Sequence, residues 1–361
     1  MALHFHSLRV KRVTPDAAGS AAITFQVPDE LREEFDFRPG QFLTLRANIE
    51  GQDVRRNYSI CSPHARYAEH GEIEVGIKPM EGGLFSRWAV SHLREGAPVD
   101  VMAPDGRFTP RLRGKVHRVG FAAGSGITPI LSIMATTLAE EPESRFTLVY
   151  SNQRTSTIMF NEVLQDLKDR YPTRVTLIHL LSRQPQEVDL LNGRLDHDKV
   201  RELLRTLVPV ESIDEAFICG PEAMITGCER ALLAAGLAPG KIHAERFLVP
   251  GAPPAKPRVA GDAPAIHGDT HQLEIVLDGK VHHLHMGADE RVLDVALDAG
   301  LDLPYSCKGG VCCTCRARVL EGEVQMEKNY TLEAAEMQRG FVLTCQSRPM
   351  TKRIVVSYDE R

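Results

Sequence analysis

Cys307-Lys-Gly-Gly-Val-Cys312-Cys-Thr-Cys315 contains three cysteines at the spacing C-x4-C-x2-C, and a fourth cysteine follows farther along the chain. Four thiolates at this spacing are the plant-type ligand set of a [2Fe–2S] cluster. Gly309 and Gly310 suit such a loop, because glycine tolerates the unusual dihedrals and close backbone approach that wrapping a cluster requires. A structural zinc site is the alternative, but zinc usually takes paired C-x2-C hooks. We therefore predict a [2Fe–2S] cluster held by Cys307, Cys312, Cys315 and Cys345.

The chain contains eight cysteines, and most of them lie in or near this loop. Disulfides are unusual in a large cytosolic protein, so a tight group of cysteines indicates metal or redox chemistry. Cys313 is the spare thiol of the loop, since its neighbours fit the ligand register better. We expect its side chain to be packed or exposed and not to bind metal.

The bulk composition excludes several classes of function. A net charge of -5 over 361 residues gives no reason to expect nucleic-acid binding, which usually requires a strongly basic domain. No apolar run approaches the roughly 18–20 residues that cross a bilayer. The first residues also lack the apolar stretch and small-residue cleavage site of a secretory signal. We expect a cytoplasmic protein that binds neither nucleic acid nor membrane.

A proline-rich stretch, Val249-Pro-Gly-Ala-Pro-Pro-Ala-Lys-Pro257, indicates a linker, because repeated prolines favour an extended spacer. Before it, short strands at 41–45 and 72–77 indicate an antiparallel barrel or sandwich. Apolar runs then alternate with helical periods, which predicts a parallel sheet covered by helices, with strands at 116–123, 146–150, 175–181 and 216–219 and helices at 129–138 and 160–167. The predicted fold is multidomain: an antiparallel β-barrel over 1–112, an α/β domain with a parallel sheet over 113–248, a linker over 249–270 and an α+β domain over 271–361.

The stretch Ala122-Ala-Gly124-Ser-Gly126-Ile-Thr128-Pro129 follows an apolar strand and opens a helix. Glycines let the backbone approach a pyrophosphate, and the free amides at a helix start attract its charge. We expect Thr128 at the N-cap and Pro129 at the first helical position. The third glycine of the common dinucleotide fingerprint is absent. The Thr-Pro variant directly after a strand resembles the ferredoxin–NADP reductase superfamily.

A second turn, Phe217-Ile-Cys219-Gly220-Pro221, resembles the same superfamily. In that superfamily this turn lies beside the nicotinamide ring. The resemblance therefore implies a catalytic and cofactor-binding role for Cys219 and cofactor contacts for Gly220 and Pro221. Taken alone, the turn could equally be a buried cysteine that ends a core strand.

Residues at two other strand ends indicate which nicotinamide is used. NAD requires an acid at the end of the second strand for its ribose hydroxyl, but this end reads Tyr150-Ser-Asn-Gln-Arg154. The third strand ends in Leu181-Ser182-Arg183, which looks like the 2′-phosphate grip of NADP-dependent superfamily members, and arginine suits bidentate phosphate binding. Two ordinary surface arginines are the alternative. We predict NADPH as the cofactor, bound in part by Arg154, Ser182 and Arg183.

A flavin is expected between the nicotinamide and the cluster, because hydride delivers two electrons together and the cluster accepts one at a time. Arg56-Asn-Tyr58-Ser59 matches the R-x-Y-S signature of the superfamily's flavin barrel. The resemblance implies that Arg56 pairs with a flavin phosphate, Tyr58 packs on the isoalloxazine ring and catalytic Ser59 bonds near N5. The stretch from Lys78 to Ser86 resembles the second phosphate loop and assigns cofactor contacts to Lys78, Gly82, Gly83, Phe85 and Ser86.

Two points about the flavin stay open in the sequence. The loops do not separate FAD from FMN, and FAD follows from the resemblance alone. Phe247 is either the aromatic residue that superfamily members place near the flavin or an ordinary core residue.

The order flavin barrel, nicotinamide domain and C-terminal ferredoxin is that of several bacterial oxygenase reductases. Residues 271–361 resemble a plant-type ferredoxin with the β-grasp fold. Longer strings at 303–316, 329–332 and 340–346 resemble the reductase subunits of ring 1,2-phenylacetyl-CoA epoxidases, which usually have a small polar residue in place of Cys313. The resemblance implies an NADPH-dependent reductase that passes electrons through FAD and [2Fe–2S] to a di-iron oxygenase in phenylacetate catabolism.

Two alternatives remain. A reductase of another hydroxylase or dioxygenase would carry the same motifs, since the docking surface is invisible in the sequence. A redox-sensing protein would keep the cluster without turnover, but Ser59, Gly126 and Cys219 have no reason to occur together in a sensor. The chain has no Glu-x-x-His pair of the kind that builds di-iron sites, so we expect a partner to handle the substrate.

Overall fold

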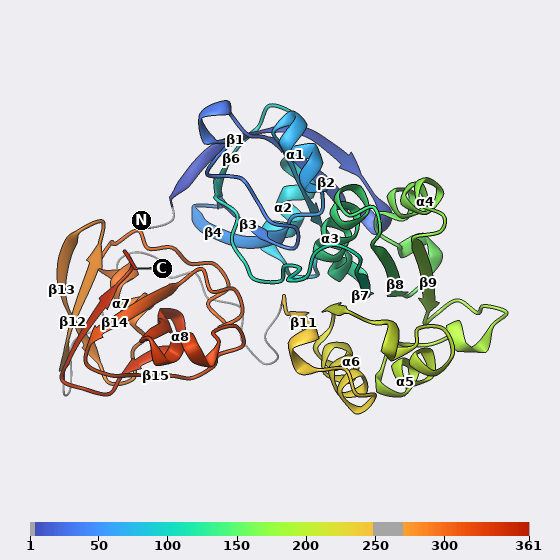
Figure 1. The fold of residues 1–361 in the computed structure, drawn as a ribbon. Helices are drawn as coiled ribbons and strands as arrows, with labels where there is room; N and C mark the ends of the chain where they lie inside the picture. Colours follow the sequence, from blue (N-terminus) through green and yellow to red (C-terminus); the bar gives the residue numbers. More distant parts are fainter. Residues whose placement is uncertain (1–3, 248–269, 361) are drawn as a thin grey trace. The chain divides into compact units, whose positions relative to one another are not determined.

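The computed structural model describes residues 4–247 and 270–360 (Figure 1). The predicted linker at 249–270 therefore lies, except for Thr270, outside the described residues. The chain divides into two compact units. The large unit contains residues 7–49 and 58–247, and the C-terminal unit contains residues 1–6, 50–57 and 248–361. Within the described ranges, no helix has the length and apolar character that a membrane span requires.

Residues 5–102 form an antiparallel sheet with strands β1 (Phe5–Pro15), β2 (Ala21–Gln26), β3 (Phe42–Ile49), β4 (Gln52–Ser59), β5 (Glu72–Ile77) and β6 (Pro98–Met102). Most of β4 and the first residues of β1 group with the C-terminal unit, and the other strands belong to the large unit. The order is β4-β3-β6-β1-β2-β5, and the pairs β1–β2, β2–β5 and β3–β6 are antiparallel. Leu8 and Val10 alternate with exposed residues on β1, as expected for a strand with one buried face. Helices α1 (His64–His70) and α2 (Leu84–His92) and the 3-10 helices η1 (Ala17–Gly19) and η2 (Asp29–Leu31) complete this part.

The second part of the large unit is a parallel sheet with strands β7 (His117–Ala123), β8 (Arg145–Asn152), β9 (Val175–Leu181), β10 (Glu215–Cys219) and β11 (Ile242–Glu245). Parallel strands need long crossover connections, which here contain α3 (Ile127–Glu140), α4 (Asn161–Arg170), α5 (His197–Thr206) and α6 (Glu222–Ala234). The strand order is β11-β10-β7-β8-β9. Short 3-10 helices are η3 (Gly124–Gly126), η4 (Thr155–Thr157), η5 (Asp189–Leu191), η6 (Val210–Ser212) and η7 (Pro239–Lys241).

The start of α3 differs from the prediction. The N-cap is Gly126 and not Thr128, and the helix begins at Ile127, which places Pro129 at the third helical position. The physical reason is that η3 runs directly into α3, with the Ile127 amide bonded to the carbonyls of Gly124 and Ser125. The Thr128 hydroxyl donates to the Ser125 carbonyl at 3.0 Å instead of accepting from a helix amide.

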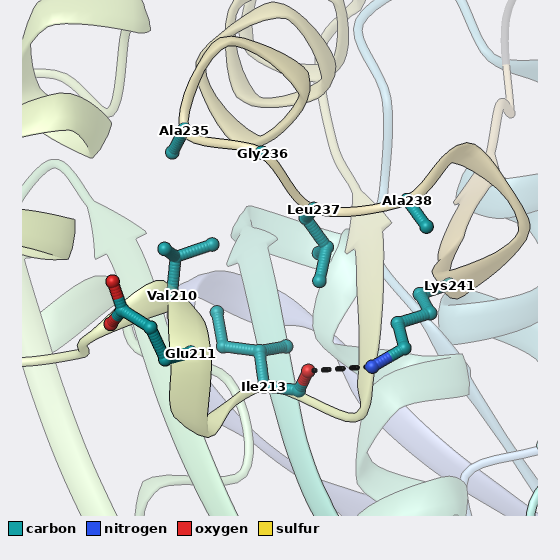
Figure 2. A pocket seen from close by; sticks show the side chains of 8 residues that line it. All are labelled: Val210, Glu211, Ile213, Ala235, Gly236, Leu237, Ala238 and Lys241. Carbon is teal, nitrogen blue, oxygen red and sulfur yellow. Dashed lines mark hydrogen bonds between the residues drawn. The ribbon is translucent and has the colours of Figure 1, made fainter.

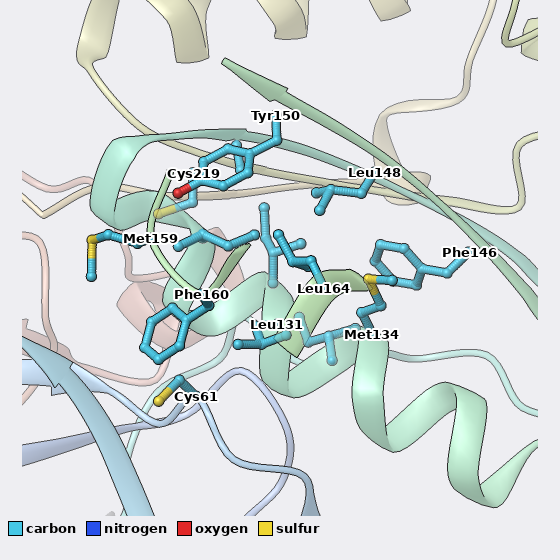
Figure 3. Packing of buried hydrophobic residues seen from close by; sticks show 14 of the residues in the cluster. Cys61, Leu131, Met134, Phe146, Leu148, Tyr150, Met159, Phe160, Leu164 and Cys219 are labelled. Atoms are coloured by element: carbon cyan, nitrogen blue, oxygen red, sulfur yellow. The ribbon is translucent and has the colours of Figure 1, made fainter. Parts of the chain in front are cut away.

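The two parts of the large unit share one hydrophobic core. Cys61 from the antiparallel part packs in the same cluster as Leu131, Phe146, Tyr150 and Phe160 of the parallel-sheet part (Figure 3). Helix α3 is buried from Ile127 to Leu138 because it lies at this junction. The antiparallel part also satisfies polar groups of this helix, since the Ser132 hydroxyl donates to the Ser62 carbonyl at 2.8 Å.

The C-terminal unit contains strands β12 (Thr270–Leu277), β13 (Lys280–Gly287), β14 (Arg316–Glu321), β15 (Val324–Met326), β16 (Phe341–Leu343), β17 (Ser347–Pro349) and β18 (Arg353–Ser357). Five of them form a mixed sheet in the order β13-β12-β18-β14-β16, while β15 pairs with β17. Helix α7 (Val292–Asp298) buries Val292, Leu293 and Ala296 in the core of this unit. Helix α8 (Ala334–Gln338) and the 3-10 helix η8 (Thr344–Gln346) complete it. The predicted three-part fold class is confirmed.

A buried ion network lies at the amino ends of the parallel strands. Arg118 has no exposed surface and donates to Glu141 Oε2 at 2.7 Å and to Glu215 Oε2 at 3.1 Å. Burial alone would raise the pKa of both carboxyls, but hydrogen bonds from their partners, Arg118 among them, outweigh it and lower both pKa values. The guanidinium therefore keeps two buried carboxylates charged.

We expect Arg118→Met to destabilise the protein by about 3–5 kcal/mol, because it removes the buried guanidinium that two buried carboxylates share. Arg113→Met is the matched control, since Arg113 contacts the same Glu141 at 3.2 Å but is 60% exposed. The control should cost less than about 1 kcal/mol. Urea denaturation followed by circular dichroism measures both variants, and equal losses of stability would contradict this account.

Candidate functional site

The two turns predicted to bind nicotinamide meet at the carboxyl ends of β7 and β10. Ala122 on β7 is the parallel partner of Cys219 on β10. A Cβ atom built on Gly126 would lie 2.1 Å from the Cys219 carbonyl oxygen and 3.0 Å from the Gly220 amide nitrogen. Only glycine permits this approach of one turn to the other. The structure thus brings Gly124, Gly126, Thr128, Pro129, Cys219, Gly220 and Pro221 into one region.

Buried groups hold these turns in place. The Tyr150 hydroxyl on β8 donates to the Gly124 carbonyl at 2.8 Å. Cys219 is fully buried, and burial raises the pKa of its thiol well above the usual value, so the group stays neutral at pH 7. Pro221 is the N-cap of α6 and makes no side-chain cap bond. Open amides at a helix start beside a glycine turn fit a pyrophosphate.

The residues predicted to bind the 2′-phosphate lie at the ends of β8 and β9. The Ser182 amide donates to the Asn152 carbonyl at 3.0 Å, and the Arg183 amide donates to the Gln153 carbonyl at 2.9 Å. This pairing brings the stretch before Arg154 alongside Ser182 and Arg183, and both arginines are exposed. Their placement is compatible with a shared anion, and their role remains a prediction.

Ser59 lies next to a carboxyl group that sequence reasoning missed. The Ser59 hydroxyl, from the end of β4, donates to Glu245 Oε2 at 3.1 Å. Glu245 on β11 is also the parallel partner of Cys219 on β10. Ser59, Cys219 and Glu245 therefore meet where the flavin part and the nicotinamide part join. No motif in the sequence singles out Glu245, because only the pairing of β11 with β10 brings it to this position.

Glu245 has an unusual protonation state. Part of the Glu245 surface remains accessible to solvent. The surrounding protein nevertheless removes enough water from the carboxyl to raise its pKa to about 8. The hydrogen bond from Ser59 lowers the pKa and offsets this rise only in part. The group is therefore mainly neutral at pH 7. A strongly shifted carboxyl beside two predicted catalytic residues is typical of a functional site.

The predicted flavin phosphate loop contains an internal hydrogen bond to one of its own side chains. The Met80 amide donates to the Ser86 hydroxyl at 3.1 Å, and Gly82 adopts a positive φ of 70°. Gly83 is the N-cap of α2 and makes no side-chain cap bond, so the first amides of α2 are available to a phosphate. Lys78 Nζ lies 3.8 Å from the position of a Cβ on Gly124, which links this loop to the nicotinamide turn.

The other residues predicted to contact the flavin differ in their packing and in the unit to which they belong. The Tyr58 ring lies 5.7 Å from the buried ring of Phe85, measured between centroids. Phe247 is 38% exposed, so the core alternative is wrong and the contact with flavin remains a prediction. Arg56 belongs to the segment 50–57 that groups with the C-terminal unit, whereas Tyr58 and Ser59 belong to the large unit.

The four predicted cluster ligands form two pairs. Within the described part of the chain, no three His, Cys, Asp or Glu side chains gather around a single ion position. Cys307 instead lies close to Cys312, and Cys315 lies close to Cys345, because in each pair the neighbouring thiol is the main cause of the shift in pKa. A [2Fe–2S] cluster held by four cysteines needs two thiolates on each iron, so two pairs fit it and a single-metal site does not.

Backbone and side-chain donors around these thiols also fit a cluster. The Cys312 thiol lowers the pKa of Cys307 to about 6, with help from the backbone amides of Gly309 and Val311. The Ser306 hydroxyl is buried and has no partner among the described residues, as expected for a group that would face a bound cluster. Cys313 is buried outside both pairs, and its thiol donates to the Thr331 hydroxyl at 2.9 Å.

A separate surface pocket of about 270 Å³ lies away from these sites (Figure 2). It is lined by Val210, Glu211, Ile213, Ala235, Gly236, Leu237, Ala238 and Lys241, and the Lys241 ammonium donates to the Ile213 carbonyl at 3.5 Å. Ile213 precedes β10, so the pocket faces the amino ends of the strands. Ligands of parallel sheets bind at the carboxyl ends, and we assign no function to this pocket.

We expect Gly126→Ala to slow reduction of the flavin by NADPH on the order of 100-fold, because even small displacements of reacting groups are costly. The new methyl group would collide with the Cys219 carbonyl. Gly240→Ala is the control, since a Cβ there meets nothing within 4 Å. Stopped-flow absorbance of the flavin measures both rates. A wild-type rate in Gly126→Ala would show that the two turns do not need this close approach.

We also expect Glu245 to impose a pH dependence on hydride arrival. Its carboxyl is neutral below its pKa of about 8 and negatively charged above it. A negative charge beside Ser59 opposes an incoming hydride, so flavin reduction should slow as the pH rises through about 8. In Glu245→Gln, the rate of flavin reduction should no longer fall as the pH rises through about 8. Glu211→Gln, at the other end of the sheet, should retain this decrease. If the rate still falls with rising pH in Glu245→Gln, the Glu245 carboxyl is not the cause of the pH dependence.

Comparisons with known proteins agree with the three parts. The family model for the oxidoreductase FAD-binding domain matches residues 9–109, that for the oxidoreductase NAD-binding domain matches 121–230, and that for the 2Fe-2S iron-sulfur cluster binding domain matches 275–350. The solved structure of phthalate dioxygenase reductase is similar in fold, with a TM-score of 0.59 and 21% identity over 98% of each chain. The predicted flavin, nicotinamide and cluster domains are confirmed.

Full-length relatives share the same organisation. The chain is 45% identical over 360 residues to a component of the 1,2-phenylacetyl-CoA epoxidase of Escherichia coli (strain K12), covering 99% of this chain and 98% of the relative. It is 34% identical over 353 residues to the ferredoxin reductase component of 3-ketosteroid-9-alpha-monooxygenase from Rhodococcus rhodochrous, covering 97% and 96%. The chain therefore belongs to the family of NAD(P)H-dependent flavin oxidoreductases that carry a [2Fe–2S] domain and serve as reductase components of oxygenases.

Proposed function

We propose that this protein supplies electrons from NADPH to a di-iron oxygenase that epoxidises the aromatic ring of phenylacetyl-CoA. The observation that carries the proposal is the 45% identity, over nearly the whole length of both chains, to the component of the Escherichia coli phenylacetyl-CoA epoxidase. We further propose that the protein works in the cytoplasm, where its buried cysteines stay reduced.

The site residues have separable tasks in this proposal. Bound FAD would accept two electrons as hydride and release them singly to the cluster. Gly126 and the turn at Cys219 would position the nicotinamide, and Ser59 would form a hydrogen bond near the atom that receives hydride. Glu245 would keep that region uncharged at pH 7, because its carboxyl has a pKa of about 8. Cys307, Cys312, Cys315 and Cys345 would hold the cluster.

A reductase for a different oxygenase is the second candidate. The 34% identity to the 3-ketosteroid-9-alpha-monooxygenase reductase component supports it, because that relative matches over 353 residues as well. The two candidates share all cofactor chemistry and differ only in the protein that accepts the electrons.

The test is NADPH-dependent oxygenation of phenylacetyl-CoA by the purified oxygenase component, with and without this protein. We expect product only when the protein is present with its flavin and iron loaded. Cys312→Ser is the matched control, because it should lose the cluster and product formation while ferricyanide reduction by the flavin survives. Rapid cytochrome c reduction without any product would overturn the phenylacetyl-CoA assignment and leave the second candidate.

We expect Arg183→Ala to lower kcat/KM for NADPH about 10- to 100-fold, because hydrogen bonds to charged groups are worth about 1.5–3 kcal/mol. The kcat/KM for NADH, which lacks the 2′-phosphate, should change little. Arg201→Ala on α5, where the side chain is 62% exposed, is the control and should leave both values unchanged. Steady-state ferricyanide reduction measures the wild type and both variants with each nucleotide. An equal loss of kcat/KM for NADPH and NADH in Arg183→Ala would contradict the phosphate contact.

A further inference from the structure

Gln346 directly follows the fourth cluster cysteine and is only 2% exposed. Its side-chain nitrogen Nε2 lies 3.4 Å from Cys345 Sγ, 2.9 Å from the Cys345 carbonyl oxygen and 3.0 Å from the Lys308 carbonyl oxygen. A buried polar side chain thus contacts both the last ligand and the loop that carries the first three.

The orientation of this amide is determined by its surroundings. A side-chain amide can be placed with its oxygen and nitrogen exchanged, and only the hydrogen-bond partners decide between the two. Two of the partners here are carbonyl oxygens, which can only accept, and a cluster-bound thiolate also only accepts. The exchanged orientation would make an amide oxygen face three acceptors, so the NH2 group must point toward Cys345 and Lys308. Its two hydrogens serve three acceptors, so the sulfur and carbonyl of Cys345 share one of them.

The contact with Lys308 fixes the shape of the ligand loop. Lys308 has a left-handed backbone conformation with φ of 49°, which is uncommon for a residue with a side chain. The bond from Gln346 to the Lys308 carbonyl holds this conformation between Cys307 and Cys312. A Cβ on Gly310 would lie 3.3 Å from Gln346 Cγ, so the glutamine side chain also fills the space beside that glycine.

We propose that Gln346 is a positioning residue that raises the reduction potential of the [2Fe–2S] cluster by donating a hydrogen bond to the Cys345 sulfur. Reduction adds one negative charge to the cluster and its thiolates. A donor aimed at a ligand sulfur stabilises the more negative, reduced state more than the oxidised state, and such outer contacts tune cluster potentials. This proposal does not depend on which oxygenase accepts the electrons.

The test compares full-length Gln346→Leu with the wild-type protein after both have been checked for flavin and iron. The leucine side chain fills much of the volume of the glutamine side chain but has no hydrogen-bond donor. We expect a more negative potential, with the ratio of reduced to oxidised cluster at a fixed potential falling about tenfold, which corresponds to about 59 mV for a one-electron couple. The potential is measured by a redox titration followed by electron paramagnetic resonance. Gln325→Leu on β15, where the side chain is exposed, is the matched control and should keep the wild-type potential.

A second readout separates a direct hydrogen bond from a general effect on folding. In pulsed electron paramagnetic resonance of the reduced protein, the amide hydrogen near Cys345 should give a proton coupling that disappears after exchange into D2O. This coupling should be absent in Gln346→Leu and retained in Gln325→Leu. Gln346→Met repeats the test with a longer side chain if the leucine variant fails to hold iron.

Either of two outcomes would overturn the proposal. A fully loaded leucine or methionine variant with the wild-type potential would show that the amide does not tune the cluster. Loss of the cluster from both variants would assign Gln346 to cluster retention instead of tuning.

Discussion

The contact between Gly126 and the carbonyl of Cys219 is the constraint on which the catalytic region depends. It seats the beginning of α3 against the end of β10, with no room for any side chain between them. The pairing of β10 with β11 places Glu245 beside Cys219, and Glu245 accepts the hydrogen bond from Ser59. Together, this close backbone approach, the strand pairing and the hydrogen bond connect the nicotinamide turns to the flavin barrel.

In the large unit, the acidic groups at the two ends of the parallel sheet have different surroundings and therefore different pKa shifts. At the amino ends, Arg118 pairs with two carboxylates, so these carboxylates stay charged. At the carboxyl ends, Glu245 accepts a hydrogen bond from a neutral hydroxyl, and its pKa rises to about 8. The first arrangement suits a stable scaffold, while the second suits a site where protonation matters near neutral pH.

The parts of the architecture that could be predicted from the sequence are those whose pattern is contained in one short stretch of the chain. The buried strands β7 to β10 appear as apolar runs, and the cluster spacing is contained in nine residues and one distant cysteine. The predicted start of α3 is wrong, because a threonine followed by proline looks like a cap and the preceding 3-10 turn has no such signature. Glu245 and Gln346 could not be proposed as functional residues from the sequence, since the proposals depend on the contacts of Glu245 with Ser59 and of Gln346 with Lys308, which join segments far apart in the chain. Cofactor roles of individual residues stay predictions, because they depend on molecules that bind the chain.

The paired arrangement of the cluster cysteines has a consequence for the biosynthesis of the protein. Cys307 lies beside Cys312, and Cys315 lies beside Cys345. Thiols in contact form a disulfide once an oxidant removes two electrons and two protons are released. The newly made chain is therefore most vulnerable in the interval before iron arrives, and delivery of the cluster competes with oxidation of the same four sulfurs.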